Sequence, residues 1–223
     1  MLPRICWRYG MEVKILSVND TIGLVHFKGL LSLDECAELI AIGSMSDAKP
    51  SMVVNGASEA AYETSGRCST VVAPSADAHP IIPEIRRRIE LFSGVAQEHQ
   101  EPLQILHYTH GGRYDIHYDS FSDESPQLKN GGNRVLTVLL YLNDVEYGGW
   151  TQFPHLMANI VPNAGFGILF RNTDAQNRQL GESLHAGLPV TDGEKWIASI
   201  WIRENPYIMP SADRADQVVR RKL

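Results

Sequence analysis

The part of the chain after residue 102 alternates short apolar runs with clusters of glycine, proline and asparagine. Each run has the length of a strand and is too short for an ordinary helix. The runs cover residues 103–108, 135–142, 160–161, 167–170 and 196–202. Short strands separated in this way by turn residues are typical of an antiparallel sandwich or barrel. The sequence therefore predicts a β core in the second half of the chain.

The first half of the chain carries two helical patterns. Residues 32–44 begin with Ser32, have Glu35 three positions later and reach Gly43, which is a capping box followed by a glycine stop. Residues 81–97 place isoleucine and leucine at helical spacing. Helices followed by strands favour an α+β, mainly β fold, with helices supporting one side of the β core.

We expect one domain over residues 1–205, with helical support at about 25–100 and the β core at about 101–205. Residues 206–223 are polar and are expected to form an exposed extension. Two polar, turn-rich stretches, 45–66 and 120–133, are expected to be mobile surface loops that could close over a substrate, the first with a short strand at 52–54.

The amino-acid composition limits the class of protein and its cellular compartment. With 43% hydrophobic and 21% charged residues the chain is expected to be soluble, and no apolar run is long enough to cross a membrane. No secretory signal is evident, and three cysteines without metal-type spacing favour a reduced, cytoplasmic setting. A net charge of −6 gives no support for nucleic-acid binding. The sequence does not reveal the oligomeric state.

The segment 108–119 contains His117 and Asp119, two positions apart. Residues i and i+2 of a strand project to the same face, so one imidazole and one carboxylate could meet one metal ion. A distant histidine would complete a facial triad with open coordination positions, the arrangement of non-haem Fe(II) oxygenases. One such pair alone is weak evidence for a metal site. His99 and Glu101, beside Pro102, form a second candidate pair.

The strand 195–202 alternates between two faces. Lys195, Ile197, Ser199 and Trp201 share one face, and Trp196, Ala198, Ile200 and Ile202 share the other. A lysine on a face that also carries tryptophan needs an anionic partner if it is buried. The alternative is that Lys195 begins the strand and extends to water.

Four ordered pieces of the sequence resemble the prolyl 4-hydroxylase family of Fe(II)/2-oxoglutarate dioxygenases. They read Y-x-x-x-G-x-Y-x-x-H-x-D (108–119), N-R-V-x-T-x-L-x-Y-L-N-D (133–144), G-G-x-T-x-F-P (148–154) and H-A-G-x-P-V-x-x-G-x-K-W (185–196). The resemblance covers about residues 27–202, and Arg67–Cys68–Ser69 fits it weakly. It implies a double-stranded β-helix, or jelly-roll, with N-terminal supporting helices.

The resemblance also implies roles for residues. His117, Asp119 and His185 would hold Fe(II), and Lys195 would bind the distal carboxylate of 2-oxoglutarate. The other positions that would line or pack against 2-oxoglutarate are Tyr108, Tyr141, Thr151 and Trp201. Tyr114 and Arg134 would face the substrate, and Trp150, which departs from the family pattern, is a guess for the substrate entrance. Tyr118 and Tyr147 are expected to be ordinary half-buried strand aromatics.

The implied activity is an O₂-dependent hydroxylation that releases succinate and CO₂, with ascorbate as a reductant. The presence of Asp119 argues for hydroxylation rather than halogenation. A proline in a peptide or protein is the favoured substrate. A free amino acid or another small molecule is the alternative, and a non-catalytic, cupin-like metal-binding protein is a remote one.

Overall fold

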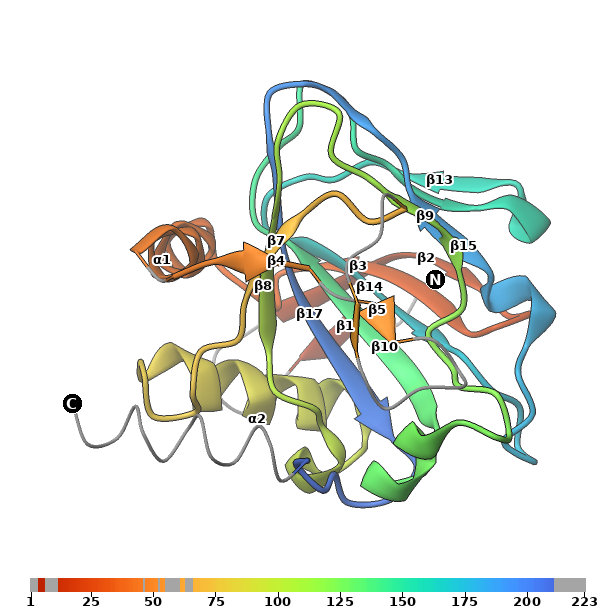
Figure 1. Ribbon diagram of the computed structural model, residues 1–223. Coiled ribbons are helices and arrows are strands. Elements are labelled where there is room, and N and C mark those ends of the chain that lie inside the picture. Colours follow the sequence, from red (N-terminus) through yellow and green to blue (C-terminus); the bar gives the residue numbers. More distant parts are fainter. Residues whose placement is uncertain are drawn as a thin grey trace.

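The computed structural model describes residues 4–6, 12–45, 47–51, 53–54, 61–62 and 66–210. Two antiparallel sheets face each other, and two helices cover the outer side of the larger one (Figure 1). This is the predicted double-stranded β-helix with supporting helices. Among the described residues, no helix is both long and apolar enough to span a bilayer.

The main sheet has nine antiparallel strands. In spatial order they are β1 (Arg4–Cys6), β2 (Glu12–Asn19), β3 (Leu24–Lys28), β14 (Phe166–Arg171), β10 (Arg134–Tyr141), β17 (Lys195–Arg203), β8 (Gln104–Tyr108), β7 (Thr70–Val72) and β4 (Lys49–Pro50). The long strands β10 and β17 lie side by side at the centre. Four of the five predicted runs after residue 102, all except 160–161, thus become the middle of this sheet.

The smaller sheet has four strands, in the order β13 (Ala158–Ile160), β12 (Thr151–Phe153), β15 (His185–Gly187) and β9 (Tyr114–His117). Two further pairs are β11 (Tyr147–Gly148) with β16 (Val190–Asp192), and β5 (Val53–Val54) with β6 (Ala61–Tyr62). In Figure 1, β9, β13 and β15 lie on the side of the molecule away from the helices.

The helices α1 (Leu33–Met45) and α2 (Ile81–Ser93) pack on the outer face of the main sheet. Their buried apolar side chains meet one face of β17 in a single core. The members of β17 on this face are Trp196, Ala198, Ile200 and Ile202, as the alternation predicts. A second core fills the space between the sheets and includes Tyr141, Phe153, Phe170 and Ile197. β17 therefore separates a structural core from the interior of the jelly-roll.

The ends of both helices have local causes. The capping box of α1 forms as predicted: Glu35 N–H donates to Ser32 Oγ (3.2 Å), and Ser32 N–H donates to Glu35 Oε2 (2.8 Å). The helix α2 ends at Ser93, four residues earlier than predicted. Gly94 adopts a left-handed conformation (φ 75°), so the chain turns and continues as a 3₁₀ helix, Gln97–His99.

Several expectations need correction. Strands β4 and β7 of the main sheet and all but the first residue of β3 lie within residues 25–100, where helical support was expected. Tyr147 is 70% exposed rather than half-buried. Half of the predicted loop 45–66 lies outside the described residues, although β5 matches its expected short strand.

The segment 120–133 is not a loose surface loop. It contains the 3₁₀ helix Pro126–Asn130, and Ser120, Ser125, Asn130 and Asn133 are buried. Backbone hydrogen bonds join it to the chain that follows β17: Asn205 N–H donates to Gly131 O (2.9 Å) and Ile208 N–H donates to Asn130 O (3.2 Å). The start of the expected exposed extension therefore docks on this segment. Residues 211–223 lie outside the described part of the chain.

Candidate active site

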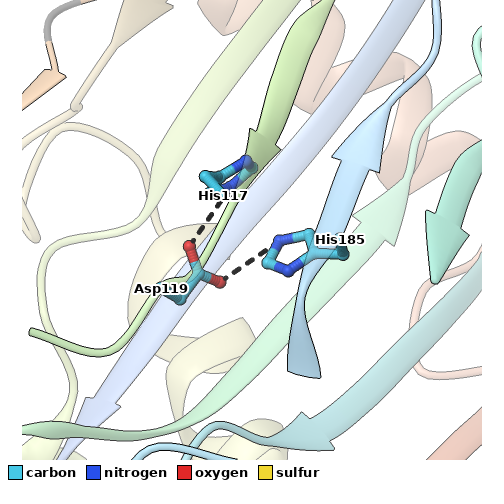
Figure 2. Close-up of side chains that lie close together, drawn as sticks. All are labelled: His117, Asp119 and His185. Atoms are coloured by element: carbon cyan, nitrogen blue, oxygen red, sulfur yellow. Dashed lines mark ion pairs between the residues drawn. The ribbon is translucent and has the colours of Figure 1, made fainter. Parts of the chain in front are cut away.

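Three potential metal ligands meet between β9 and β15. His117 ends β9, Asp119 follows two residues later, and His185 begins β15. The antiparallel register places His185 directly opposite His117. Their ligand atoms and those of Asp119 all lie within 4.8 Å of one another (Figure 2). Asp119 Oδ1 is 3.6 Å from His117 Nε2, and Asp119 Oδ2 is 3.6 Å from His185 Nε2.

Both imidazoles are oriented by the backbone. His117 Nδ1 is 2.8 Å from Asp115 O, and His185 Nδ1 is 2.8 Å from Ser183 O. A carbonyl oxygen only accepts, so each Nδ1 carries the proton and each Nε2 keeps its lone pair. This is how metal-binding histidines are usually oriented. Both Nε2 atoms face Asp119, and the three groups form a ready donor set.

The protonation states suit a metal ion. Burial lowers the pKa of His185 to about 4, so its imidazole is neutral at pH 7. Burial opposes ionisation of Asp119, but the adjacent imidazoles of His185 and His117 outweigh it, and the pKa of Asp119 falls well below its usual range. The site therefore offers two imidazole nitrogens and one carboxylate, a donor set suited to Fe(II).

The triad opens into a cavity between the two sheets. Its lining residues are Arg67, Leu106, Tyr108, Tyr114, His117, Asp119, Leu139, Thr151, His185, Gly187, Lys195, Ile197, Ser199 and Trp201. All four members of the predicted inward face of β17 are among them. Ser199 was on that face but was given no role from the sequence. Arg67 lines the cavity as well and lies over the Tyr114 ring at 4.5 Å.

Lys195 is 4% exposed, so it does not extend to water. Its ammonium donates to Gly149 O and lies 5.5 Å from the centre of the Tyr108 ring. Within the described part of the chain, no carboxylate pairs with it. Burial lowers its pKa to about 7, because a charge without a counter-ion is costly there. A carboxylate bound in the cavity would restore the charged form.

Two buried donors that line the cavity lack hydrogen-bond partners among the described residues. Ser199 Oγ and Trp201 Nε1 make no hydrogen bond with the described residues. Tyr141 does not line the cavity but is fully buried behind it, and its hydroxyl donates to Thr151 Oγ1 (2.9 Å). Unsatisfied polar groups beside a buried lysine are what a small polar anion would satisfy. The residues present therefore fit an iron ion together with 2-oxoglutarate.

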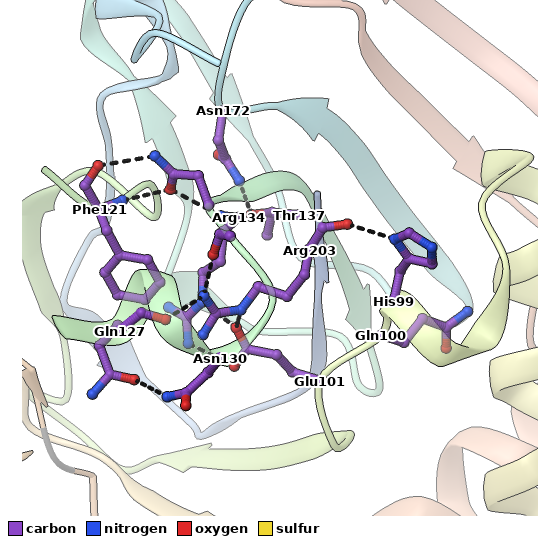
Figure 3. Close-up of polar contacts among 12 residues, drawn as sticks. His99, Gln100, Glu101, Phe121, Gln127, Asn130, Arg134, Thr137, Asn172 and Arg203 are labelled. Atoms are coloured by element: carbon purple, nitrogen blue, oxygen red, sulfur yellow. Dashed lines mark hydrogen bonds and ion pairs between the residues drawn. The ribbon is translucent and has the colours of Figure 1, made fainter. Parts of the chain in front are cut away.

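Two residues predicted to contact the substrate are elsewhere. Arg134 does not line the cavity. Its guanidinium makes two hydrogen bonds with Glu101 (2.6 and 2.8 Å; Figure 3). It also lies 3.8 Å from the centre of the Trp201 ring. Trp150 is 39% exposed and also lies outside the cavity lining. Tyr114 does line the cavity, and its ring stacks on His117 (3.6 Å).

The rival pair His99 and Glu101 forms no metal site. Glu101 also accepts from Arg203 Nε (2.6 Å), and His99 Nδ1 contacts Arg203 O (3.1 Å). Burial opposes ionisation of Glu101, but Arg134 and Arg203 outweigh it and lower its pKa. Its carboxylate is thus already neutralised by two arginines.

Comparison with known proteins agrees with this site. Residues 103–203 match the model of the 2OG-Fe(II) oxygenase superfamily. The chain is 33% identical to probable prolyl 4-hydroxylase 10 of Arabidopsis thaliana, over 87% of this chain and 73% of that protein. It is 31% identical to probable prolyl 4-hydroxylase 6 of the same plant, over 87% of this chain and 73% of that protein.

Solved structures give the same result. The viral collagen prolyl hydroxylase of Paramecium Bursaria Chlorella virus-1, in complex with 2-oxoglutarate, is 31% identical, with a TM-score of 0.64 over 80% of this chain and 94% of that one. A Pseudomonas putida prolyl-4-hydroxylase is 20% identical and shares the fold, with a TM-score of 0.53 over 82% and 94%. This chain belongs to the prolyl 4-hydroxylase family of Fe(II)- and 2-oxoglutarate-dependent dioxygenases.

Proposed function

We propose that this protein hydroxylates a prolyl residue of a peptide or protein. The observation that carries the proposal is one cavity that joins three metal-ligating side chains to a buried lysine without a carboxylate partner among the described residues. The relatives at about 30% identity are named as prolyl hydroxylases, which favours proline over other acceptors. A prolyl hydroxylase from Trichoplax adhaerens with the same fold was solved with a hypoxia inducible factor peptide, an example of a peptide substrate on this scaffold.

In this proposal His117, Asp119 and His185 hold Fe(II), and Lys195 binds the distal carboxylate of 2-oxoglutarate. When bound, iron and 2-oxoglutarate supply the oxidising chemistry, in which O₂ is consumed, succinate and CO₂ are released and a C–H bond is hydroxylated. Tyr108 and Trp201 line the 2-oxoglutarate site. Thr151 donates a hydrogen bond to 2-oxoglutarate, and the hydroxyl of Tyr141 orients Thr151 by donating to its Oγ1. The apolar wall of Leu106, Leu139 and Ile197 excludes water.

On the substrate side, Tyr114 is proposed to contact the bound peptide. Its ring lies under the Arg67 guanidinium and stacks on the imidazole of His117, one of the metal ligands. Arg134 acts through Trp201, whose ring it holds by stacking. Trp150 is placed outside the cavity and is proposed to meet only the outer parts of a long substrate.

Three further points belong to the proposal. Ascorbate would act as the reductant that keeps the iron ferrous. The reduced, cytoplasmic setting is proposed on the three cysteines, which lack metal-type spacing. One catalytic domain over residues 1–205 would include the N-terminal strands, because β2 and β3 extend the main sheet.

The test is succinate formation from 2-oxoglutarate by protein loaded with Fe(II) and ascorbate. Three samples are compared: no acceptor, a proline-rich peptide, and free L-proline. We expect the peptide to stimulate succinate formation and to gain the mass of one oxygen atom. Stimulation by free proline alone would favour the small-molecule alternative. Metal binding without any succinate would overturn the proposed activity.

A further inference from the structure

A chain of buried hydrogen bonds reaches the carboxylate of Asp119 from the main sheet. Thr137 Oγ1 lies 2.6 Å from Asp119 Oδ2, and Asn172 Nδ2 lies 2.8 Å from Thr137 Oγ1 (Figure 3 shows the second contact). Thr137 and Asn172 are both 0% exposed, and Asp119 is 5% exposed. Neither Thr137 nor Asn172 lines the cavity. Thr137 therefore contacts the Asp119 carboxylate from outside the cavity, and Asn172 acts on it only through Thr137.

The direction of these hydrogen bonds follows from donor chemistry. An ionised carboxylate only accepts, so the single proton of the Thr137 hydroxyl must point at Asp119. Thr137 Oγ1 can then only accept from its other neighbour. The amide of Asn172 meets this requirement with its NH₂ group, whereas in the flipped orientation its oxygen would compete with Asp119 for the Thr137 proton. In the orientation present, Asn172 Oδ1 is buried and has no hydrogen-bond partner among the described residues. Asn172 thus fixes the direction in which the Thr137 hydroxyl points.

Asn172 is itself held by the sheet. Its backbone N–H donates to Val135 O (2.9 Å), and its carbonyl accepts from Leu180 N–H (2.9 Å). Thr137 sits on the central strand β10, opposite Phe170 on β14 and Trp201 on β17. Asp119, by contrast, follows β9 of the smaller sheet. The two hydrogen bonds therefore fasten a metal ligand of one sheet to the rigid centre of the other.

We propose that Thr137 and Asn172 are positioning residues that keep one oxygen of Asp119 engaged, so that the carboxylate offers a single oxygen to the metal ion. A carboxylate free to rotate could present both oxygens and occupy a coordination position that 2-oxoglutarate or O₂ needs. Partners of this kind fix ligand orientation and metal affinity. The inference rests on the proposed function only in requiring that Asp119 binds the metal.

The test measures binding of Co(II), in place of Fe(II), to the full chain without 2-oxoglutarate. Thr137→Val removes the hydroxyl but keeps the shape. We expect it to weaken Co(II) binding roughly 10- to 100-fold and to change the visible absorption of the bound ion. Thr137→Ser keeps the hydroxyl and is expected to stay within about threefold of the unaltered protein, with the same spectrum.

The role of Asn172 is tested by a double-mutant cycle. Asn172→Leu is expected to weaken Co(II) binding by a smaller factor, about three- to tenfold, and to have no further effect once Thr137 is valine. If the two losses of Co(II) affinity multiply in the double variant, Asn172 does not act through Thr137. That result would overturn the inferred series of hydrogen bonds. If Thr137→Val does not fold, the Asn172→Leu and Thr137→Ser variants still test the inference. Unchanged Co(II) binding in Asn172→Leu would contradict it.

A stability control separates positioning from general loosening of the fold. Val138→Ala removes apolar contacts from the neighbouring residue of β10, whose fully buried side chain belongs to the core beneath the helices. We expect it to lower the melting temperature while Co(II) affinity and spectrum stay unchanged. Equal loss of Co(II) affinity in Val138→Ala and Thr137→Val would overturn the inference. Failure of the unaltered protein to bind Co(II) would instead reject the proposed metal site itself.

Discussion

The ammonium group of Lys195 is buried beside two tyrosine rings, where a positive charge is costly without an anion. Lys195→Met should therefore weaken 2-oxoglutarate binding roughly 10- to 100-fold, the effect of losing one charge-assisted hydrogen bond. Calorimetry on the Mn(II)-loaded protein measures the dissociation constant of 2-oxoglutarate. The exposed Lys14→Met serves as a matched control and should leave 2-oxoglutarate affinity unchanged. Unaltered affinity in Lys195→Met would assign the anion to another group.

The same lysine predicts a pH dependence. Its pKa in the empty cavity is lowered to about 7, so the charged form that binds a carboxylate is fully present only below that pH. Binding the anion raises the pKa again, and 2-oxoglutarate affinity should therefore fall as pH rises from about 7, by up to about tenfold per pH unit. Titration between about pH 6 and 9 measures the slope. Lys195→Met should give a much flatter profile, and a flat profile in the unaltered protein would contradict the assignment.

Removing a metal ligand should abolish turnover without unfolding the chain. Asp119→Ala and His185→Ala each delete one donor from a cluster at the edge of the inner core. We expect succinate formation to fall to background while the circular dichroism spectrum keeps its β signature. His155→Ala is the control, because that imidazole is exposed, contacts the carbonyl of Gly181 and is not one of the three clustered ligands. Full activity in either ligand variant would exclude the triad as the catalytic metal site.

At the scale of elements, the end of β17 is tied to the segment 120–133. The Arg203 side chain is 2% exposed and donates to Glu101, to Gln127 O and to Gly132 O. Arg203→Met should lower the free energy of unfolding by about 3 kcal/mol, because a buried ion pair and two carbonyls lose their partner. Urea denaturation measures this. The exposed Arg178, paired with Asp174, is the control, and Arg178→Met should change stability by less than about 1 kcal/mol.

Elements also show what the sequence could predict. The alternation of β17 correctly separated the cavity face from the helix face, because a strand repeats every two residues regardless of its neighbours. The end of α2 was misplaced by four residues, because the apolar pattern continues past Gly94 whereas the backbone does not. The sequence also could not predict the ion-pair partner of Arg134. Glu101 lies 33 positions away, and only folding brings the two charges together.

At the scale of the whole molecule, the metal and 2-oxoglutarate would join the two sheets. Ligands that bind only the folded state stabilise it by mass action. Adding Co(II) and 2-oxoglutarate together at about 100 times their dissociation constants should therefore stabilise the protein by about 3 kcal/mol or more and raise its melting temperature by several degrees. Lys195→Met should reduce the increment from 2-oxoglutarate while keeping that from Co(II). No change in melting temperature with both ligands would contradict binding at this site.

The pairing of His117 with His185 across two antiparallel strands has a consequence for insertions and deletions. The 67 residues between them can vary in length within their loops, because the register of β9 and β15 alone sets the distance between the imidazoles. A slip of one residue in β15 would bring Ala186 opposite His117 and turn His185 to the other face. Length variation among related sequences should therefore collect in the connecting segments and be absent from these two strands.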